Sequence, residues 1–298
     1  MRMMLARAHA PRPLLAAILL GSLTFAAQAD DALPSRVSVP SADGRTTLTG
    51  YVFMPAGKSA ERTAAVVMLH GRAGAYSAAA AGQYDAATLS QRHLMWGRTW
   101  AAHGYLALLV DGFGPRGYPA GFPRFSYDRR PPELNEVTVR PLDAYGALGY
   151  LRTRADVIAD RIGLMGWSNG GSATLATMAV DVPAMSGRTP AQGFRAALVF
   201  YAGCGLHGRY QNGLKPYAPV REFHGTGDEE VSWKTCAALV EKGRAQGGDI
   251  AITVYRGATH SFDDPGRKRQ SDPANVGAKQ DAMARSLAFF AEQLGAAR

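Results

Sequence analysis

Hydrophobic residues occur along the chain in short runs that are separated by longer, partly polar segments. The first two runs, 35–39 and 47–54, flank Ala42-Asp43-Gly44, which is typical of a hairpin turn, so they predict an antiparallel pair of strands. Later runs are apolar throughout, as expected for strands that are buried on both faces of a sheet. There are six of them: 64–69, 105–110, 161–165, 196–200, 220–224 and 251–255.

Helical segments are expected between most of these strands. They are 92–102, 140–152, 168–180, 233–245 and 275–294. Because strands alternate with helices, the pattern predicts an α/β fold with a mainly parallel central sheet, an antiparallel hairpin at its N-terminal end and helices on both faces. Neither an internal repeat nor a long linker divides the series, so we expect a single domain over residues 30–298.

Two connections are longer than a simple strand-to-helix turn. Segment 72–91 is rich in Ala, Gly and Ser and is compatible with either a short helix or a mobile flap. Segment 112–135 carries five Pro and several aromatic residues, which predict an ordered irregular loop. Both follow strand ends where open α/β sheets place their binding sites, so substrate selection is expected there.

The first 29 residues have the features of a secretory signal peptide. Three arginines within the first twelve residues precede an apolar stretch at 14–25, and Ala27-Gln28-Ala29 is a small-x-small cleavage sequence. A membrane anchor is the alternative, but the apolar stretch is shorter than the roughly 20 residues that span a bilayer. We therefore expect a secreted or periplasmic protein with no stable membrane insertion after cleavage.

Composition and charge exclude several classes of protein. Of 298 residues, 47% are hydrophobic and 19% are charged, which excludes a disordered chain and a disulfide-stapled miniprotein. Loss of residues 1–29 removes three Arg and lowers the formal net charge from +9 to +6. The one dense basic run, Arg267-Lys268-Arg269, lies in a loop rich in Pro, Gly and Asp and is interpreted as a solvated turn. No nucleic-acid partner is expected, because the chain has no basic stripe or nucleic-acid motif.

The two cysteines gain significance if the chain is exported, because an oxidising compartment permits disulfides. A bond between Cys204 and Cys236 would close a loop of about 30 residues, worth about 3 to 4 kcal/mol of stability in the loop-entropy relation. Two buried thiols are the alternative. Neither cysteine has a neighbouring base in the sequence that would make it a nucleophile.

The motif Gly166-Trp167-Ser168-Asn169-Gly170 follows a predicted strand and precedes a predicted helix. In this context G-x-S-x-G is typical of a nucleophile elbow, a tight turn that lifts the serine hydroxyl above the sheet. Glycine at both flanks lets neighbouring segments approach closely, and the helix N-terminus offers N–H groups to a developing negative charge. Ser168 is the candidate nucleophile.

A serine hydroxyl needs a base, and a neutral imidazole suits this role near pH 7. His260 follows the last predicted strand, in a loop that can return to Ser168. The other histidines of the mature chain lie at strand ends, in a helix or in a loop, where a packing role is more common. They are His70, His93, His103, His207 and His224. His260 is therefore the candidate base.

A carboxylate is required to hold the imidazole in one tautomer and to stabilise its cation. Asp228 comes first after the glycine turn that follows the strand at 220–224, whereas Glu229 and Glu230 are interpreted as acids of a solvated helix start. Asp263 and Asp264 are too close in sequence to His260 and are interpreted as loop residues. Asp228 gives the order Ser, Asp, His, which is that of α/β-hydrolases.

An oxyanion hole requires two N–H donors that point at the oxygen that gains charge. We expect one from the backbone of Asn169, directly after the nucleophile, and one from the backbone of Arg72, after the strand at 64–69. The Arg72 side chain is open to two interpretations, a contact with a substrate carboxylate or exposure to solvent.

These segments resemble the dienelactone hydrolase family of α/β-hydrolases, over residues from about 60 to 290. The resemblance is carried by Leu69-His70-Gly71, by Asp111-Gly112-Phe113-Gly114-Pro115-Arg116-Gly117, by the strand and turn from Arg161 to Gly171, by Tyr201-Ala202-Gly203-Cys204-Gly205, and by the turns at Asp228 and His260. It implies an α/β-hydrolase fold with Ser168, Asp228 and His260 at the nucleophile, acid and base positions.

Two positions differ from enzymes of the family that open dienelactones. Those enzymes use a cysteine where this chain has Ser168, and a glutamate where it has Gly71. A serine nucleophile with an ordinary triad indicates a hydrolase of small-molecule carboxylic esters or lactones that works through an acyl-enzyme and needs no cofactor or metal.

Two alternatives remain at this stage. A peptidase of the prolyl-oligopeptidase type shares the triad order, and a non-catalytic binding protein can be built on a hydrolase scaffold. The sequence does not specify the acyl and alcohol groups of the substrate or the oligomeric state.

Overall fold

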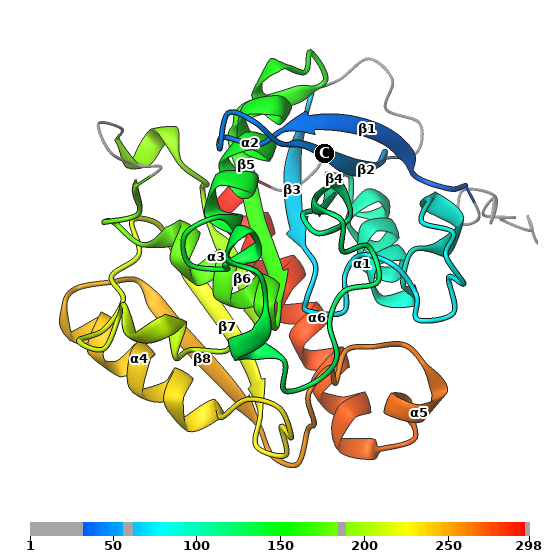
Figure 1. Cartoon of the computed structure of the whole chain (residues 1–298). Coiled ribbons are helices and arrows are strands. Elements are labelled where there is room, and N and C mark those ends of the chain that lie inside the picture. Colours follow the sequence, from blue (N-terminus) through cyan, green and yellow to red (C-terminus); the bar gives the residue numbers. More distant parts are fainter. Residues whose placement is uncertain (1–31, 56–61, 184–188, 296–298) are drawn as a thin grey trace, which may run out of the picture. The chain divides into compact units, whose positions relative to one another are not determined.

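A central sheet of eight strands organises the molecule, as a computed structural model shows for residues 32–55, 62–183 and 189–295 (Figure 1). The sheet order is β1-β2-β4-β3-β5-β6-β7-β8. The β1–β2 and β2–β4 pairs are antiparallel and the other pairs are parallel. The strands are β1 (Ser35–Pro40), β2 (Thr47–Phe53), β3 (Thr63–Leu69), β4 (Leu106–Asp111), β5 (Val157–Trp167), β6 (Ala197–Phe200), β7 (Val220–Gly225) and β8 (Ile250–Tyr255).

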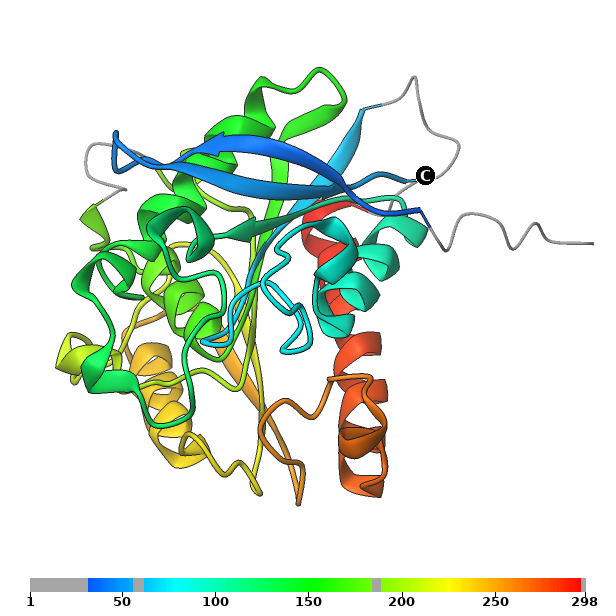
Figure 2. The same ribbon diagram turned by 45° about the vertical axis from the view of Figure 1, so that its right-hand side comes forward.

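Helices cover both faces of the sheet, because alternate residues of the inner strands point to opposite sides. In β3, Ala65, Val67 and Leu69 pack toward α2, α3 and α4, whereas Val66 and Met68 pack toward α1 and α6. Figure 2 shows helices on both sides of the sheet. The helices are α1 (Gln91–Ala102), α2 (Arg140–Thr153), α3 (Asn169–Met178), α4 (Trp233–Ala245), α5 (Arg267–Gln270) and α6 (Pro273–Leu294). The predicted α/β architecture, a mainly parallel sheet with an antiparallel N-terminal hairpin and helices on both faces, is confirmed.

Three local differences from the prediction have physical causes. Strand β5 begins at Val157 because its first residues pair with Thr63, across an irregularity in the β3–β5 register. Helix α3 begins at Asn169, since Ser168 has φ +52° and cannot be a helical residue. The basic run at Arg267 forms the short helix α5 instead of a turn.

The two long connections are ordered loops with little regular structure. In 72–91, a bridge joins Tyr76 to Leu89 and a single 3-10 turn spans Ala86–Thr88. The second loop, 112–135, contains three 3-10 turns and donates from the Phe122 N–H to the Arg72 carbonyl at 2.8 Å. The two loops therefore pack on each other at the carboxyl ends of β3 and β4.

The expected signal peptide, residues 1–29, lies outside the described residues. None of the helices that the structure describes combines the length and apolar character of a membrane span.

Candidate active site

Ser168 lies in a tight turn between β5 and α3, with φ +52° and ψ −115°. This left-handed conformation is strained for a residue with a side chain, and it is held by close packing on both sides. A Cβ on Gly166 would lie 2.2 Å from the Gly170 carbonyl oxygen, and a Cβ on Gly170 would lie 2.1 Å from the Leu69 carbonyl oxygen. Both flanking positions of the G-x-S-x-G motif therefore require glycine.

His260 reaches Ser168 from the loop after β8. Its Nε2 lies 3.0 Å from the Ser168 Oγ, and its Nδ1 lies 2.8 Å from Oδ2 of Asp228. The imidazole is only 3% exposed and lies against the Tyr201 ring, with the ring centroids 4.7 Å apart. The structure thus brings together the serine, histidine and aspartate that the sequence singled out.

Asp228 is held by donors on both carboxylate oxygens. Its Oδ1 accepts from the backbone N–H groups of Glu230 at 2.8 Å and Val231 at 2.9 Å. Burial alone would raise the pKa of Asp228, but the neighbouring His224 and the hydrogen bond to His260 lower that pKa well below its usual range. The carboxylate is therefore ionised and points one oxygen at His260.

Arg72 and Asn169, whose backbone N–H groups are the expected oxyanion donors, both line a pocket beside Ser168. Asn169 directly follows Ser168, and a Cβ on Gly71 would lie 3.4 Å from the Ser168 Cβ. Within the part of the chain that the structure describes, neither N–H donates to another group. The Asn169 side chain is held away by Arg140 and Glu136, at 2.6 and 3.0 Å. Both N–H groups are thus free to meet an anionic oxygen.

The side chains of Arg72, Glu229 and Glu230 correct the sequence interpretation. Arg72 donates to both carboxylate oxygens of Glu230 at 2.8 Å, so it is neither solvent-facing nor free for a substrate. The Glu229 carboxylate accepts from the backbone N–H of His260 at 2.9 Å and pairs with Arg269. The two glutamates therefore fix the walls of the site and are not part of a helix, since α4 begins only at Trp233.

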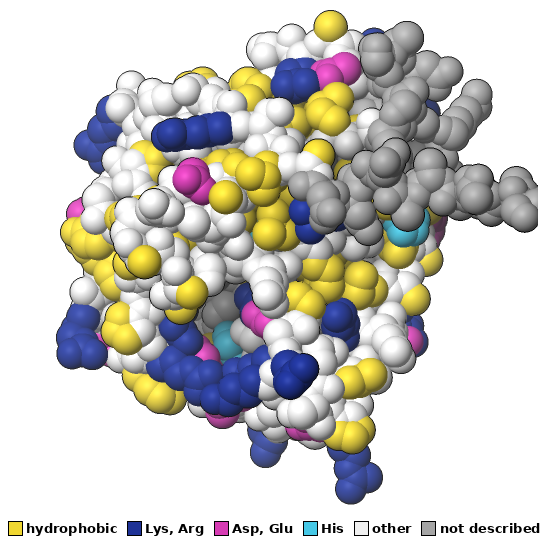
Figure 3. Space-filling model, turned by 90° about the vertical axis from the view of Figure 1, so that its right-hand side faces the viewer, with side chains coloured by type: hydrophobic (Ala, Val, Ile, Leu, Met, Phe, Trp, Pro, Cys, Tyr) yellow, Lys and Arg dark blue, Asp and Glu magenta, His cyan; other side chains and the backbone are white. Residues whose placement is uncertain are grey.

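Positive side chains gather on the outer surface near these acids. Arg124 also pairs with both Glu229 and Glu230, at 3.3 and 2.9 Å. Figure 3 shows a band of Lys and Arg side chains beside a hollow in which a His and acidic side chains are visible. The net positive charge is thus partly gathered on one face of the molecule.

A fully buried carboxylate, Asp263, joins the base loop to the nucleophile strand. Its Oδ2 accepts from the indole N–H groups of Trp96 at 2.8 Å and Trp167 at 2.9 Å, and its Oδ1 accepts from the Tyr201 hydroxyl. Arg92 Nε lies 3.4 Å from Oδ1. The interpretation of Asp263 as a loop residue, made from the sequence, missed this role. The three hydrogen-bond donors come from segments distant in sequence, so no local sequence pattern indicates that they meet Asp263.

We expect Asp263→Asn to lower the free energy of unfolding by about 2 to 4 kcal/mol, because the amide nitrogen cannot accept and leaves buried donors unpaired. Urea unfolding followed by tryptophan fluorescence measures this loss. Asp264→Asn is the matched control, since that side chain is 33% exposed and its ion pair with Arg92 is worth at most about 1 kcal/mol. Equal losses in the two variants would contradict a structural role specific to Asp263.

A pocket of about 380 Å³ opens beside Ser168. The loop 112–135 supplies one wall, as expected, and its Phe125 is 75% exposed. Another part of the lining comes from the loop after β6, which the sequence did not indicate as part of the site. Within segment 72–91, Arg72 is the one residue that lines this pocket. The lining residues are Arg72, Phe125, Tyr127, Arg130, Ser168, Asn169, Ser172, Gly203, Gly205, His207, Glu230 and Val231.

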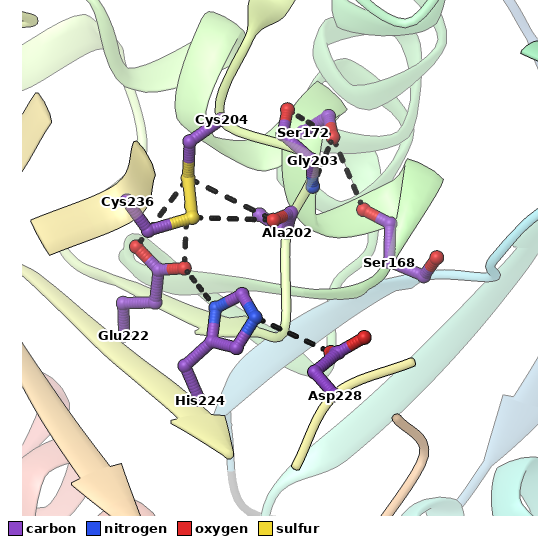
Figure 4. Close-up of a disulfide and its surroundings, with 9 residues drawn as sticks. All are labelled: Ser168, Ser172, Ala202, Gly203, Cys204, Glu222, His224, Asp228 and Cys236. Carbon is purple, nitrogen blue, oxygen red and sulfur yellow. Dashed lines mark hydrogen bonds and ion pairs between the residues drawn. A yellow bond between two sulfur atoms is a disulfide. The ribbon is translucent and has the colours of Figure 1, made fainter. Parts of the chain in front are cut away.

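Cys204 and Cys236 form a disulfide with an Sγ–Sγ distance of 2.03 Å, and it ties the loop after β6 to α4 (Figure 4). Next to it, the Gly203 backbone exchanges two hydrogen bonds of 3.0 Å with the Ser172 hydroxyl. Among the described residues, Cys204, Glu222 and Cys236 lie close enough together to ligate a metal ion. Because both sulfurs are bonded to each other, they have no thiolate to offer one.

Of the remaining histidines, His70 and His93 are buried and hydrogen-bonded to backbone carbonyls, as expected for packing residues. His207 stacks on Tyr127 at the pocket wall and lies 3.2 Å from Glu136. His224 differs from the expectation, because its Nε2 lies 3.2 Å from Asp228 Oδ2.

The model of the dienelactone hydrolase family matches residues 48–294. A probable 2-oxo-3-(5-oxofuran-2-ylidene)propanoate lactonase of a Bradyrhizobium species is 28% identical over 179 residues, which are 54% of this chain and 64% of that protein. The match thus spans less than two thirds of that relative.

Solved structures show the same fold at low identity. A Klebsiella pneumoniae protein assigned as a dienelactone hydrolase has a TM-score of 0.65 at 19% identity, over 87% of this chain and 98% of its own. Apo esterase 2 of Thermogutta terrifontis has a TM-score of 0.61 at 21% identity, over 89% of this chain and 96% of its own. The same esterase phosphorylated by paraoxon has a TM-score of 0.60 at 20% identity, over 90% of this chain and 97% of its own.

Proposed function

The chain belongs to the dienelactone hydrolase family, and we propose that it is a serine hydrolase that cleaves carboxylic esters or lactones. The observation that carries this proposal is the continuous contact from the Ser168 hydroxyl through His260 to Asp228. A relative named as a lactonase and a structural neighbour named as an esterase support the same class of substrate.

In the proposed reaction, Ser168 Oγ attacks the ester carbonyl carbon while His260 Nε2 takes the hydroxyl proton. The backbone N–H groups of Arg72 and Asn169 receive the carbonyl oxygen as it becomes negative. His260 then gives the proton to the leaving alkoxide, and an acyl-enzyme remains on Ser168. Water, activated by the same imidazole, releases the acid. Asp228 accepts from Nδ1–H of His260 throughout, so that in the neutral ring Nε2 carries the lone pair that accepts the proton.

The proposal is tested by whether the wild-type protein hydrolyses a p-nitrophenyl ester and is labelled by a fluorophosphonate. Paraoxon phosphorylates the Thermogutta esterase, which makes an organophosphorus probe a reasonable choice here. Turnover of the ester together with labelling supports the proposal. Absence of labelling in folded protein would favour a binding role, and faster cleavage of a matched peptide amide than of the ester would favour a peptidase.

The length of the acyl chain that the pocket accepts is expected to depend on Gly205. This residue has φ −67° and ψ −31°, a conformation open to all residues, and a Cβ there would meet nothing within 4 Å. Since Gly205 lines the pocket and open space surrounds its Cβ position, we expect a Leu side chain there to occupy part of the pocket. Gly205→Leu should lower kcat/KM for a p-nitrophenyl octanoate about 10- to 100-fold while sparing the acetate. Kinetics on acetate, butyrate and octanoate esters, with Gly205→Ala as control, measure this; an equal loss on all three would contradict it.

A further inference from the structure

A second pair of ionisable side chains lies buried behind the triad, at the end of β7. Glu222 and His224 both have side chains that are 0% exposed, and neither lines the pocket. Figure 4 shows the two side chains in line between the disulfide and Asp228. The reaction outlined above gives them no role.

The distances connect this pair to the triad through one oxygen atom. His224 Nδ1 lies 3.2 Å from Oε1 of Glu222, and His224 Nε2 lies 3.2 Å from Oδ2 of Asp228. Oδ2 is the same oxygen that His260 contacts through Nδ1 at 2.8 Å. One carboxylate oxygen thus faces two imidazole rings.

The proton on His224 Nε2 follows from the two acids that flank the ring. If Glu222 is ionised, a doubly protonated ring donates at both ends; if Glu222 is protonated, it donates to Nδ1 and the neutral ring keeps its hydrogen on Nε2. A neutral ring with hydrogen only on Nδ1 would turn a lone pair toward the ionised Asp228, which is repulsive. In both favourable arrangements the hydrogen on Nε2 faces Asp228 Oδ2 across 3.2 Å, a distance that suits an ion pair although the two groups are not aligned as a hydrogen bond.

Burial and the neighbouring groups keep these protons in place. Burial alone would lower the pKa of His224, but Asp228 and Glu222 raise that pKa to about 9. Burial raises the pKa of Glu222, while His224 and the Ala202 backbone oppose this rise. The disulfide that covers Glu222, with Cys204 Sγ 3.6 Å from Oε1, does not titrate.

We propose that His224 is a positioning residue: it presents Nε2–H to Asp228 Oδ2 as an ion-pair partner and, anchored by Glu222, fixes the carboxylate that orients His260. The effect of this contact on turnover rests on the proposed function, whereas the contact between His224 and Asp228 does not. Because two imidazole rings face Oδ2, His224 also weakens the electrostatic attraction between this oxygen and His260. Loss of the donor therefore both loosens Asp228 and strengthens its attraction for a proton on His260.

The other charged groups around the two rings are already paired. From the turn after β7, Glu230 lies 3.8 Å from His260 Nε2 and is held by Arg72 and Arg124. Glu229 faces the His260 backbone and is held by Arg269. From the segment after β6 and from α4, the neighbours that the structure describes are the Tyr201 ring and the disulfide. A change at His224 therefore acts on His260 through Asp228.

Two substitutions of His224 test its two ring nitrogens separately. The amide nitrogen of Gln can occupy the position of Nε2, whereas the amide nitrogen of Asn can occupy the position of Nδ1. His224→Asn should lower kcat about 10- to 30-fold with KM unchanged, and should move the acid limb of the kcat pH profile about one unit upward. His224→Gln, which keeps the donor, should stay within about threefold of wild type and shift the limb by less than half as much. Equal losses in both variants, or no change in His224→Asn, would overturn the proposal in favour of simple packing.

A measurement on the wild-type protein tests the same contact without activity or a variant. In ¹⁵N NMR of the folded protein, His224 Nε2 should carry a hydrogen from pH 6 to 8, and a bare Nε2 would overturn the proposal. Failure of the wild type to hydrolyse any ester would instead refute the proposed function and leave this readout intact.

Discussion

Ser168→Ala is expected to lower kcat for a p-nitrophenyl ester by about four to six orders of magnitude, because the members of a triad act as a unit. Without the hydroxyl, His260 has no proton to remove and no acyl-enzyme can form. The free energy of unfolding should change little, since the methyl group fits the same turn and, among the described residues, the Ser168 hydroxyl is hydrogen-bonded to His260 alone. Steady-state kinetics and thermal melting measure the two effects.

Fluorophosphonate labelling gives this prediction a second, chemical readout. The wild-type protein should gain one adduct, mapped by mass spectrometry to Ser168, and Ser168→Ala should gain none. Ser38→Ala is the matched control, because Ser38 is exposed on the edge strand β1, and it should label and turn over like wild type. Unchanged turnover in Ser168→Ala would end the assignment of the nucleophile.

The sequence predicted the parts of the fold and site that depend on short segments. The alternation of apolar runs with helices gave the order of elements, and G-x-S-x-G specified the turn at Ser168 because close backbone packing demands both glycines. His260 and Asp228 could be placed because each follows a strand at the same edge of a parallel sheet.

Contacts between distant segments escaped prediction for a physical reason. Asp263 meets Trp96 and Trp167 across 167 and 96 positions of sequence, and Arg72 meets Glu230 across 158. A local pattern cannot distinguish a carboxylate that a folded loop buries from one that stays in water. His224 escaped for a related reason, because a strand-end histidine gains a role only when a turn places Asp228 against it.

Asp228→Asn is expected to lower kcat about 10³- to 10⁴-fold, by trapping His260 in the wrong tautomer. Two backbone N–H groups, of Glu230 and Val231, point at Oδ1 and cannot give up their hydrogens. The imidazole of His224 beside Oδ2 can lose the hydrogen on Nε2, so we expect the amide oxygen to take the place of Oδ1. The amide nitrogen then occupies the place of Oδ2 and donates its hydrogen to His260 Nδ1, which must be bare. The hydrogen of the ring moves to Nε2, facing Ser168, where a base needs a lone pair.

The tautomer itself distinguishes this mechanism from a loss of folding. In ¹⁵N NMR of folded Asp228→Asn, the hydrogen of neutral His260 should lie on Nε2, whereas the wild type should carry it on Nδ1. Asp249→Asn is the matched control, since that side chain is 57% exposed in a surface pair with Arg221, and its kcat should equal that of wild type. An active Asp228→Asn, or one that is slow with the hydrogen still on Nδ1, would mean that Asp228 does not select the tautomer and that the base at residue 260 is oriented by other contacts.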